Sequence, residues 1–202
     1  MDATKPLLLF DLGGVVVEFS GLADMHGLLR EPMPVEDVNR LFSASQAIAD
    51  FEVGLLTPEE FGAAFANAWS LNCSEAEFLA HYESWTRALL PGADALLTEL
   101  AASYRLAALS NSNILHWTRN DVVIGVQSYF ERAFSSHELG VRKPDPEIFR
   151  RALSELGVEP AEVVFFDDNA LNVEAAQAFG ISAHRVEGVD QVRARLADLG
   201  LL

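Results

Sequence analysis

The stretch PLLLFDLGGVVVEF, residues 6–19, constrains the fold of this 202-residue chain more than any other. It contains the apolar run Leu7–Phe10, which has the length and composition of a strand buried on both faces, as in a parallel sheet. The run ends at Asp11, and Gly13 and Gly14 follow, which can adopt backbone angles that other residues resist. Open α/β sheets bind ligands at such strand ends. Because Asp and Gly are also ordinary turn residues, this stretch alone leaves a ligand site and a simple turn equally open.

Residues 20–90 contain no clear strand and several helical patterns. Helical spacing covers residues 21–30 and 35–45, and Thr57 and Ser74 each stand where a helix N-cap is expected. These 70 or so residues are therefore expected to form a small helical bundle. Its core is expected to include Phe42, Phe51, Trp69 and Trp85, whose helical spacing favours packing over a substrate platform.

Residues 91–202 alternate between helical and strand patterns. Strands are expected at 106–109, 133–135, 163–166 and 181–186, and helices at 94–103, 147–156, 171–179 and 189–199. This alternation predicts parallel pairing with right-handed crossovers. The fold class is therefore α/β: a Rossmann-like parallel-sheet core formed by residues 1–19 and 91–202, with a helical-bundle cap, residues 20–90, inserted after the first strand and above Asp11.

The composition narrows the possible partners and surroundings. A net charge of −16 disfavours nucleic acid and anionic membranes as partners. No run approaches the roughly 18 apolar residues of a membrane span, and the N-terminus does not resemble a signal peptide. Cys73 is the only cysteine, so an internal disulfide is impossible. These features predict a soluble, cytoplasmic protein.

Three of the predicted strands end in polar residues, which should meet at one edge of the sheet. These residues are Asp11, Ser110–Asn111 and Asp167–Asp168, and the loop between the last two groups carries Lys143. Clustered carboxylates resist joint ionisation, whereas Mg²⁺, which prefers oxygen ligands, would relieve the repulsion. A lysine and hydroxyl or amide donors beside such an ion suit a phosphate. Asp11 would then attack phosphorus, with Mg²⁺, Lys143 and Ser110 stabilising the charge.

Four motifs in this order resemble the haloacid dehalogenase (HAD) superfamily, in which phosphohydrolases dominate. They are FDLGGVV at 10–16, SNS at 110–112, RKPDPEIF at 142–149 and VVFFDDNALNVEAAQAFG at 163–180. The helical insert resembles the helical cap of that family. The first and last motifs are most similar to the bacterial sugar-phosphate phosphatases that include α-D-glucose-1-phosphate phosphatase.

The resemblance implies a role for each matching residue. Asp11 would be the nucleophile and a Mg²⁺ ligand, and the carbonyl of Gly13 a second ligand. Ser110 and the backbone of Asn111 would hold the phosphate, and Lys143 would bridge the phosphate and Asp11. Asp167 and Asp168 would bind Mg²⁺ directly or through water. The implied activity is Mg²⁺-dependent hydrolysis of a small phosphorylated metabolite, such as a sugar phosphate, through an aspartyl-phosphate on Asp11.

Gly13 departs from the common pattern of the family, which has a second aspartate, the general acid/base, at that position. Water, Glu18 or His26 could take over its role. The alternatives are a 2-haloacid dehalogenase that uses the same Asp11, since halide needs no proton to leave, and a non-catalytic binding protein that has kept the fold.

Overall fold

The computed structural model describes residues 5–202. The strands are β1 (Leu7–Phe10), β2 (Val17–Phe19), β3 (Thr86–Leu89), β4 (Leu106–Ser110), β5 (Arg132–Ser135), β6 (Val163–Asp167) and β7 (Ser182–Arg185). The α-helices are α1 (Gly21–Leu28), α2 (Val35–Ser43), α3 (Gln46–Glu52), α4 (Pro58–Ala68), α5 (Glu75–Glu83), α6 (Ala93–Ala101), α7 (Ile114–Arg119), α8 (Ser136–Leu139), α9 (Pro146–Leu156), α10 (Ala170–Ala178) and α11 (Gly188–Asp198). Short π and 3₁₀ segments are η1 (Asn120–Ile124), η2 (Val126–Tyr129) and η3 (Pro160–Glu162).

The main sheet is parallel and has the strand order β5-β4-β1-β6-β7. β1 occupies its centre, so its side chains meet protein on both sides. Leu7 and Leu9 belong to one hydrophobic core, and Leu8 and Phe10 belong to the other. The predicted α/β class, the parallel pairing and the doubly buried first strand are therefore confirmed.

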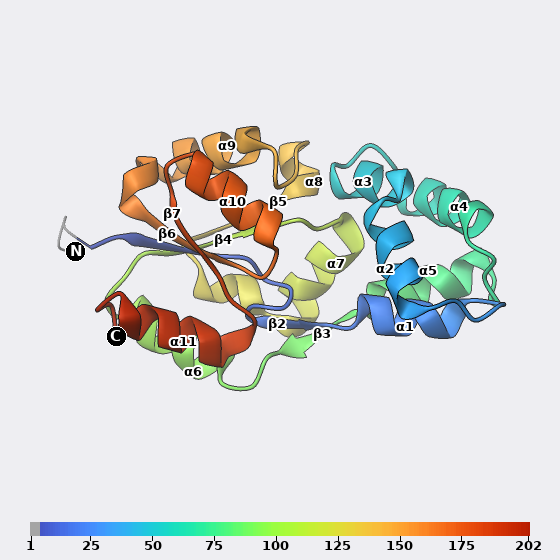
Figure 1. Cartoon of the computed structure of the whole chain (residues 1–202), viewed down its shortest axis with the longest axis horizontal. Helices are drawn as coiled ribbons and strands as arrows, with labels where there is room; N and C mark the ends of the chain where they lie inside the picture. The colour runs from blue at the N-terminus through green and yellow to red at the C-terminus, as the bar shows by residue number, and fades with distance from the viewer. Residues whose placement is uncertain (1–4) are drawn as a thin grey trace.

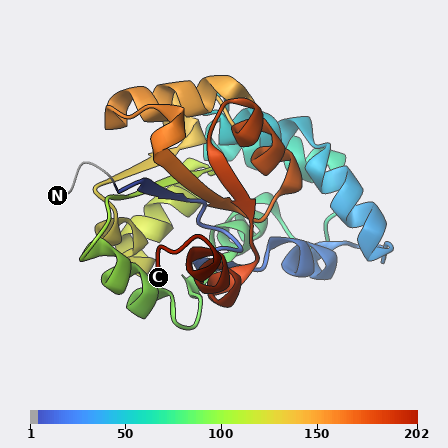
Figure 2. The same ribbon diagram turned by 60° about the vertical axis from the view of Figure 1, so that its left-hand side comes forward.

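Helices cover both faces of this sheet, as Figure 1 shows. α9 and α10 pack on one face, where Ile148 and Phe149 join the core of Leu7 and Leu9. α6 and α11 pack on the other face, where Leu96 joins the core of Phe10. The same two layers flank the sheet in the turned view of Figure 2. This arrangement leaves the carboxyl ends of the strands free to form a site.

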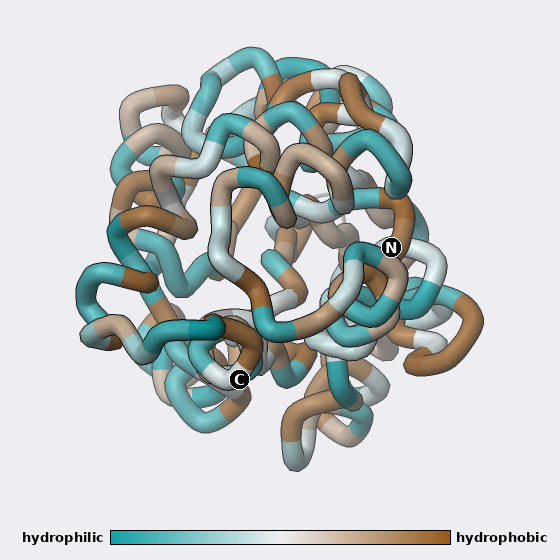
Figure 3. Tube along the Cα trace, turned by 90° about the vertical axis from the view of Figure 1, so that its right-hand side faces the viewer, coloured by the Kyte–Doolittle hydropathy of each residue, from teal (hydrophilic) through white to brown (hydrophobic). Residues whose placement is uncertain are grey.

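Helices α1–α5 gather beyond one end of the sheet and have a hydrophobic core of their own. Thr57 and Ser74 form the expected capping boxes at the starts of α4 and α5. Figure 3 views the molecule from the right-hand side of Figure 1 and shows hydrophilic and hydrophobic residues interspersed along the trace, as expected for helices with one buried face. The aromatic side chains of Phe51, Trp69 and Trp85 are buried in this core, as predicted.

The expectation that residues 20–90 contain no strand is wrong. β3 (Thr86–Leu89) pairs antiparallel with β2, the stretch that follows the first glycine turn. Its sequence, TRAL, has too few residues to show a period of two, and its partner lies about 67 positions earlier in the chain. The pairing is therefore a tertiary event that local pattern cannot reveal. The β2–β3 ribbon joins α1–α5 to the rest of the chain.

Within residues 5–202, no helix combines the length and the apolar character that crossing a bilayer would require.

Candidate active site at the carboxyl edge of the sheet

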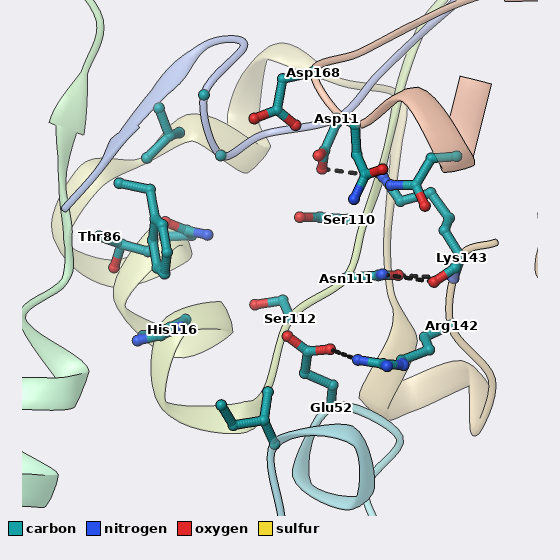
Figure 4. A pocket seen from close by; sticks show the side chains of 18 of the residues that line it. Asp11, Glu52, Thr86, Ser110, Asn111, Ser112, His116, Arg142, Lys143 and Asp168 are labelled. Atoms are coloured by element: carbon teal, nitrogen blue, oxygen red, sulfur yellow. Dashed lines mark hydrogen bonds and ion pairs between the residues drawn. The ribbon is translucent and has the colours of Figure 1, made fainter. Parts of the chain in front are cut away.

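A cavity of about 570 Å³ lies at the carboxyl ends of β1, β4 and β6. One part of its wall carries Asp11, Ser110, Lys143 and Asp168, which are labelled in Figure 4. The remainder comes mainly from helices α2, α3, α5 and α10, from the β2–β3 ribbon and from the α7–η1 segment. The structure therefore brings together the polar strand ends that the sequence placed at one sheet edge.

Asp11 follows β1 directly and is held by backbone contacts. Its amide donates to the carbonyl of Phe166, at 2.8 Å, and its Oδ1 accepts from the amide of Leu12, at 2.7 Å. The residue is 9% exposed. Burial raises the pKa of Asp11 to about 7; neighbouring carboxylates add to the rise, and the Lys143 ammonium opposes it.

Lys143 is the central cation of the site. Its Nζ donates to the carbonyl of Leu109 and to Oδ2 of Asp167, each at 2.7 Å, and lies 3.2 Å from Oδ1 of Asp11. Its side chain has no exposed surface. Burial lowers the pKa of Lys143, but Asp11 and Asp167 outweigh burial, and the net pKa is raised. The lysine therefore stays charged next to the carboxylate predicted to be the nucleophile.

The side chain of Asn111 forms two hydrogen bonds with the backbone of Lys143. Its Nδ2 donates to the Lys143 carbonyl at 2.9 Å, and its Oδ1 accepts from the Lys143 amide at 2.8 Å. Both ends of the amide are thus used within the protein. Because the side chain of Asn111 is fully hydrogen-bonded to Lys143, its backbone is the part that is left to bind a phosphate, as the family resemblance implied.

Asp167 and Asp168 differ sharply in their surroundings. Asp167 is fully buried and accepts four hydrogen bonds, from Lys143, from the amide of Asn169 and, on both oxygens, from Nδ2 of Asn172. No other residue in 5–202 hydrogen-bonds to the carboxylate of Asp168, which lines the cavity. Burial, with the charge of Asp167, raises the pKa of Asp168. The oxygen atoms of Asp168 are therefore free for a ligand, whereas those of Asp167 already accept hydrogen bonds within the protein.

The residues present fit a divalent cation. Asp11, Asp167 and Asp168 each offer a carboxylate oxygen, and these three atoms lie within 4.8 Å of one another. Gly13 also lines the cavity, and none of the hydrogen bonds within residues 5–202 ends on its carbonyl. A hard cation such as Mg²⁺ takes oxygen ligands of this kind and would offset the clustered negative charge.

Gly14 sets the shape of the turn beside these carboxylates. It has a φ of +73°, and a Cβ atom built on it would lie 2.6 Å from Oδ2 of Asp168. Both the backbone angle and the close approach exclude a side chain. Of the two glycines in the turn, Gly14 is the one that the backbone requires.

The part of the cavity wall that lies away from Asp11, which we call the far wall, contains residues that sequence reasoning missed. Glu52, at the end of α3, contacts Arg142, with 2.6 Å between Oε2 and Nη1, and its carbonyl accepts from the hydroxyl of Ser136. Burial raises the pKa of Glu52, although Arg142 opposes the rise. Nothing in the local pattern around Glu52 marks it, because the contact joins residues 90 positions apart.

A buried network connects α5 to α7 in this wall. Nε2–H of His116 donates to the carbonyl of Tyr82 at 2.6 Å, and Nδ1 accepts from the side-chain Nδ2 of Asn113 at 3.1 Å. Burial lowers the pKa of His116 to about 4, so the ring is neutral near pH 7. His116 therefore contributes shape and hydrogen bonding to the wall, without charge.

The structure places Glu18, His26 and Phe42 differently from what the sequence suggested. Glu18 and His26, considered as substitutes for the missing general acid/base, do not line the cavity, and His26 bonds instead to the carbonyl of Met33. Phe42 is only partly buried in the helical core and also lines the cavity. It therefore belongs to both, because α2 lies where the helical core meets the site.

The fold and the site together define an α/β protein with a helical layer beside a parallel sheet and a carboxylate cluster at the carboxyl edge of that sheet. A family model described as haloacid dehalogenase-like hydrolase matches residues 6–180. The chain belongs to this family of haloacid dehalogenase-like hydrolases, and the predicted resemblance is confirmed.

The chain is similar to a flavin mononucleotide hydrolase and to a sesquiterpene phosphatase. Flavin mononucleotide hydrolase 1 of Arabidopsis thaliana is 29% identical over 202 residues, which span 97% of this chain and 78% of that protein. The sesquiterpene phosphatase astK of Aspergillus oryzae is 28% identical over 188 residues, or 90% of this chain and 89% of that protein.

Solved structures share the fold. A HAD family enzyme from Bacteroides thetaiotaomicron, in complex with magnesium and inorganic phosphate, is 27% identical and has a TM-score of 0.73. The match covers 91% of this chain and 94% of that enzyme.

Proposed function

We propose that this hydrolase cleaves phosphate monoesters in a Mg²⁺-dependent reaction that passes through an aspartyl-phosphate on Asp11. The observation that carries the proposal is the position of the Asp11 carboxylate, 3.2 Å from the buried Lys143 ammonium and within 4.8 Å of an oxygen of Asp167 and of Asp168. This geometry supplies a nucleophile, a fixed positive charge and a set of oxygen ligands in one cavity.

In the proposed mechanism an Asp11 oxygen forms a bond to phosphorus as the ester oxygen leaves with its electron pair. Water then attacks the aspartyl-phosphate, which releases inorganic phosphate and restores the carboxylate. Nζ of Lys143 and the hydroxyl of Ser110 would donate to the phosphoryl oxygens, whose charge they stabilise. The amide clamp of Asn111 holds Lys143 in place for this contact.

Asp11, the Gly13 carbonyl and Asp168 are the groups that would hold the cation. Asp167 would support it from behind, because its oxygens already accept hydrogen bonds from Lys143 and Asn172. When bound, Mg²⁺ would neutralise phosphoryl charge and favour the ionised form of Asp11.

Gly13 provides no side chain to protonate the leaving oxygen. Esters of acidic alcohols and phenols, which leave without a proton, should therefore react fastest, since a missing general acid costs roughly 10²–10⁴-fold in rate. This dependence on the leaving group is an expected property of the enzyme.

The sesquiterpene phosphatase, which matches 90% of this chain, and the similar structure with magnesium and phosphate support this reaction over dehalogenation, whereas (S)-2-haloacid dehalogenase 1 of Pseudomonas matches only 45% of the chain. A haloacid dehalogenase has no use for a cation site, so the free carboxylate of Asp168 also favours the phosphatase. A non-catalytic role would not require the charged Lys143 beside Asp11.

The remaining parts of the proposal concern the rest of the chain. Residues 20–90 would act as a cap domain over a core domain of residues 1–19 and 91–202, since the helical residues line the far wall of the cavity. A small phosphorylated metabolite would be the substrate. A cytoplasmic location stays a prediction from the sequence.

The test is release of inorganic phosphate from a panel of phosphate esters, measured with Mg²⁺ and with EDTA. We expect turnover that requires Mg²⁺ and that Asp11→Asn abolishes. Asp121→Asn is the matched control, because Asp121 is exposed and does not line the cavity. Turnover that persists in EDTA, or in the Asp11→Asn variant, contradicts the mechanism; 2-chloropropionate hydrolysis without phosphate release would favour the dehalogenase alternative.

A further inference from the structure

Aromatic side chains make up a continuous part of the cavity wall, which we call the aromatic wall. It consists of Phe19, Phe42, Tyr82 and His116. The ring of the buried Trp85 lies beneath it, with its centroid 6.4 Å from that of Phe19 and 5.9 Å from that of Phe42. His116 stacks on Tyr82, with 4.4 Å between the ring centroids. In Figure 4, His116 lies across the cavity from Lys143, so the aromatic wall borders the space next to the predicted phosphate site.

Phe19 is the most accessible residue of the aromatic wall. It is 42% exposed, whereas Tyr82 and His116 are 2% and 5% exposed and Phe42 is half-buried. The Phe19 ring is nevertheless held in place. Its centroid lies 5.7 Å from that of His116 in a T-shaped contact, and a Cβ atom built on Gly21 would lie 2.6 Å from the ring. A large apolar ring that is both fixed and exposed inside a cavity is a surface on which a ligand can pack.

Phe19 also borders the place where the common pattern of the family has its general acid. A Cβ atom built on Gly13 would lie 3.7 Å from Cβ of Phe19, an ordinary contact distance. A side chain at position 13 would therefore occupy space beside Phe19, and glycine leaves that space to the substrate. A general acid must reach the leaving oxygen within hydrogen-bond distance, so the leaving oxygen is expected close to this place. The first atoms of the leaving group would then lie beside Phe19.

The polar groups of the aromatic wall already have partners within the protein. The Tyr82 hydroxyl accepts from Nδ2 of Asn113 at 3.1 Å, and both ring nitrogens of His116 are hydrogen-bonded. The charged neighbours Glu52 and Arg142, which also line the cavity, are paired with each other at 2.6 Å. A charged leaving group would have to disrupt that ion pair, whereas an aromatic ring could pack on Phe19 without replacing any of these contacts.

We propose that Phe19, together with Phe42, forms a platform for an aromatic ring in the leaving group, so that the substrate is an aryl phosphate, the phosphate ester of a phenolic hydroxyl. This inference rests on the proposed phosphatase function and names its substrate class. Two independent observations lead to it. Gly13 supplies no proton, which a phenolate leaving group does not require, and an exposed aromatic ring borders the place of the leaving oxygen.

The test measures the binding of phosphonates, in which carbon replaces the bridging oxygen and which a phosphatase does not hydrolyse. Benzylphosphonate carries an aromatic ring, cyclohexylmethylphosphonate carries a saturated ring with the same number of carbon atoms, and methylphosphonate carries no ring. Calorimetric titration in the presence of Mg²⁺ gives the three Kd values. Benzylphosphonate should bind about 3- to 10-fold more tightly than cyclohexylmethylphosphonate, because contacts between aromatic rings add to the apolar burial that both ligands share.

Substitutions assign this preference to particular rings. Phe19→Leu keeps an apolar side chain without the ring, so the ratio of the two Kd values should fall to about one, and Phe42→Leu should lower it by a smaller factor of about 2-fold. Phe179→Leu is the matched control. Phe179 is half-buried like Phe42, packs on the sheet and does not line the cavity, so the wild-type ratio should persist. The affinity for methylphosphonate should be the same in all these proteins.

Several outcomes overturn the platform. They are equal binding of the two ring-bearing phosphonates, a Phe19→Leu variant that keeps the wild-type ratio, and benzylphosphonate that binds no more tightly than methylphosphonate. A preference for the aromatic ring that Phe19→Leu removes supports the platform even if the enzyme releases phosphate from no ester and the proposed function fails.

Turnover tests the substrate class separately. Phenyl phosphate is compared with hexafluoroisopropyl phosphate, whose alcohol is about as acidic as phenol and has no ring. Because the two leaving groups need a proton equally little, the wild-type kcat/KM should favour phenyl phosphate by at least about 3-fold through ring contacts alone. Equal kcat/KM values would show that the enzyme selects its substrates by leaving-group acidity and not by an aromatic ring, which contradicts the proposed substrate class and leaves the phosphatase function intact.

Discussion

Replacing Lys143 by methionine should destabilise the protein strongly, because it leaves buried carboxylates without their cation. Methionine keeps most of the apolar stem and removes only the charge and the donors. The ammonium lies 2.7 Å from Oδ2 of Asp167 and 3.2 Å from Oδ1 of Asp11, and the side chains of Lys143 and Asp167 have no exposed surface. Removal of one partner of a buried ion pair costs about 3–5 kcal/mol.

The expected change is large enough for a thermal-unfolding measurement. For a chain of this size each kcal/mol shifts the midpoint by about 2–4 °C, so Lys143→Met should lower Tm by roughly 6–20 °C near pH 7.5. Circular dichroism without Mg²⁺ measures this shift. Added Mg²⁺ should recover part of the loss, since a bound cation replaces the missing charge and stabilises the folded state.

Arg132→Met is the matched control. Arg132 and Glu155 form an ion pair at 3.0 Å whose side chains are 59% and 48% exposed. Such exposed pairs contribute at most about 1 kcal/mol, which corresponds to roughly 4 °C or less. If Lys143→Met lowers Tm by no more than Arg132→Met does, the Lys143 ion pairs do not stabilise the fold, and the reasoning from burial is refuted.

Three further predictions follow from single contacts in the site. Asp168→Asn should weaken Mg²⁺ binding at least about 10-fold with little change in Tm, whereas Asp167→Asn should mainly lower Tm. Calorimetric Mg²⁺ titration and thermal unfolding measure the two effects. Identical behaviour of the two variants would contradict the different roles given to Asp167 and Asp168. Burial lowers the pKa of His116 from 6.5 to about 4, so its contribution to stability is present above pH 6.5 and is lost as pH falls toward 4. Urea unfolding should show that, between pH 7 and pH 4, the free energy of unfolding of the wild type falls by about 3 kcal/mol more than that of His116→Gln, whose glutamine does not titrate. If the difference between the two proteins is the same at both pH values, the ring is not buried in its neutral form. Gly14→Ala should lower the free energy of unfolding by at least about 1–2 kcal/mol and weaken Mg²⁺ binding, because the Cβ of the alanine would displace Asp168. An unchanged Mg²⁺ affinity would count against the close approach of residue 14 to Asp168.

The part of the site around Asp11 was largely predictable from sequence, because Asp11, Ser110 and Asp167 stand at the ends of strands with clear apolar runs. Asp11, Ser110 and Asp167 stand at the ends of β1, β4 and β6, and parallel pairing brings such ends to one edge. Knowing the strands and their parallel order was therefore sufficient to expect that these groups meet.

The far side was not predictable, because no local pattern connects its residues. Thr86 lies in a strand defined only by its pairing with β2, and Asn120 lies in the short π-helical segment η1. Glu52 meets Arg142 across 90 positions of sequence. The signals for these residues exist only once the helices have packed against the sheet edge.

Asp167 and Asp168 show the limit most clearly. They are adjacent and chemically identical in sequence, so sequence reasoning could not rank them as metal ligands. Asp167 is the last residue of β6, a strand that is buried throughout, and it contacts Lys143 and Asn172, whereas Asp168 follows the strand and lines the cavity. The end of the strand separates the two aspartates, but only the neighbouring elements decide what each one contacts.

The sequence by itself determined the α/β class, the parallel sheet, the helical insert and the edge at which polar strand ends meet, because hydrophobic period and turn residues are local properties. Only the tertiary structure decided which carboxylate keeps free oxygens, which asparagine hydrogen-bonds the backbone of Lys143, and which arginine pairs with Glu52. These are properties of burial and hydrogen-bond satisfaction, which depend on every element that packs around a side chain and therefore exist only in the folded chain.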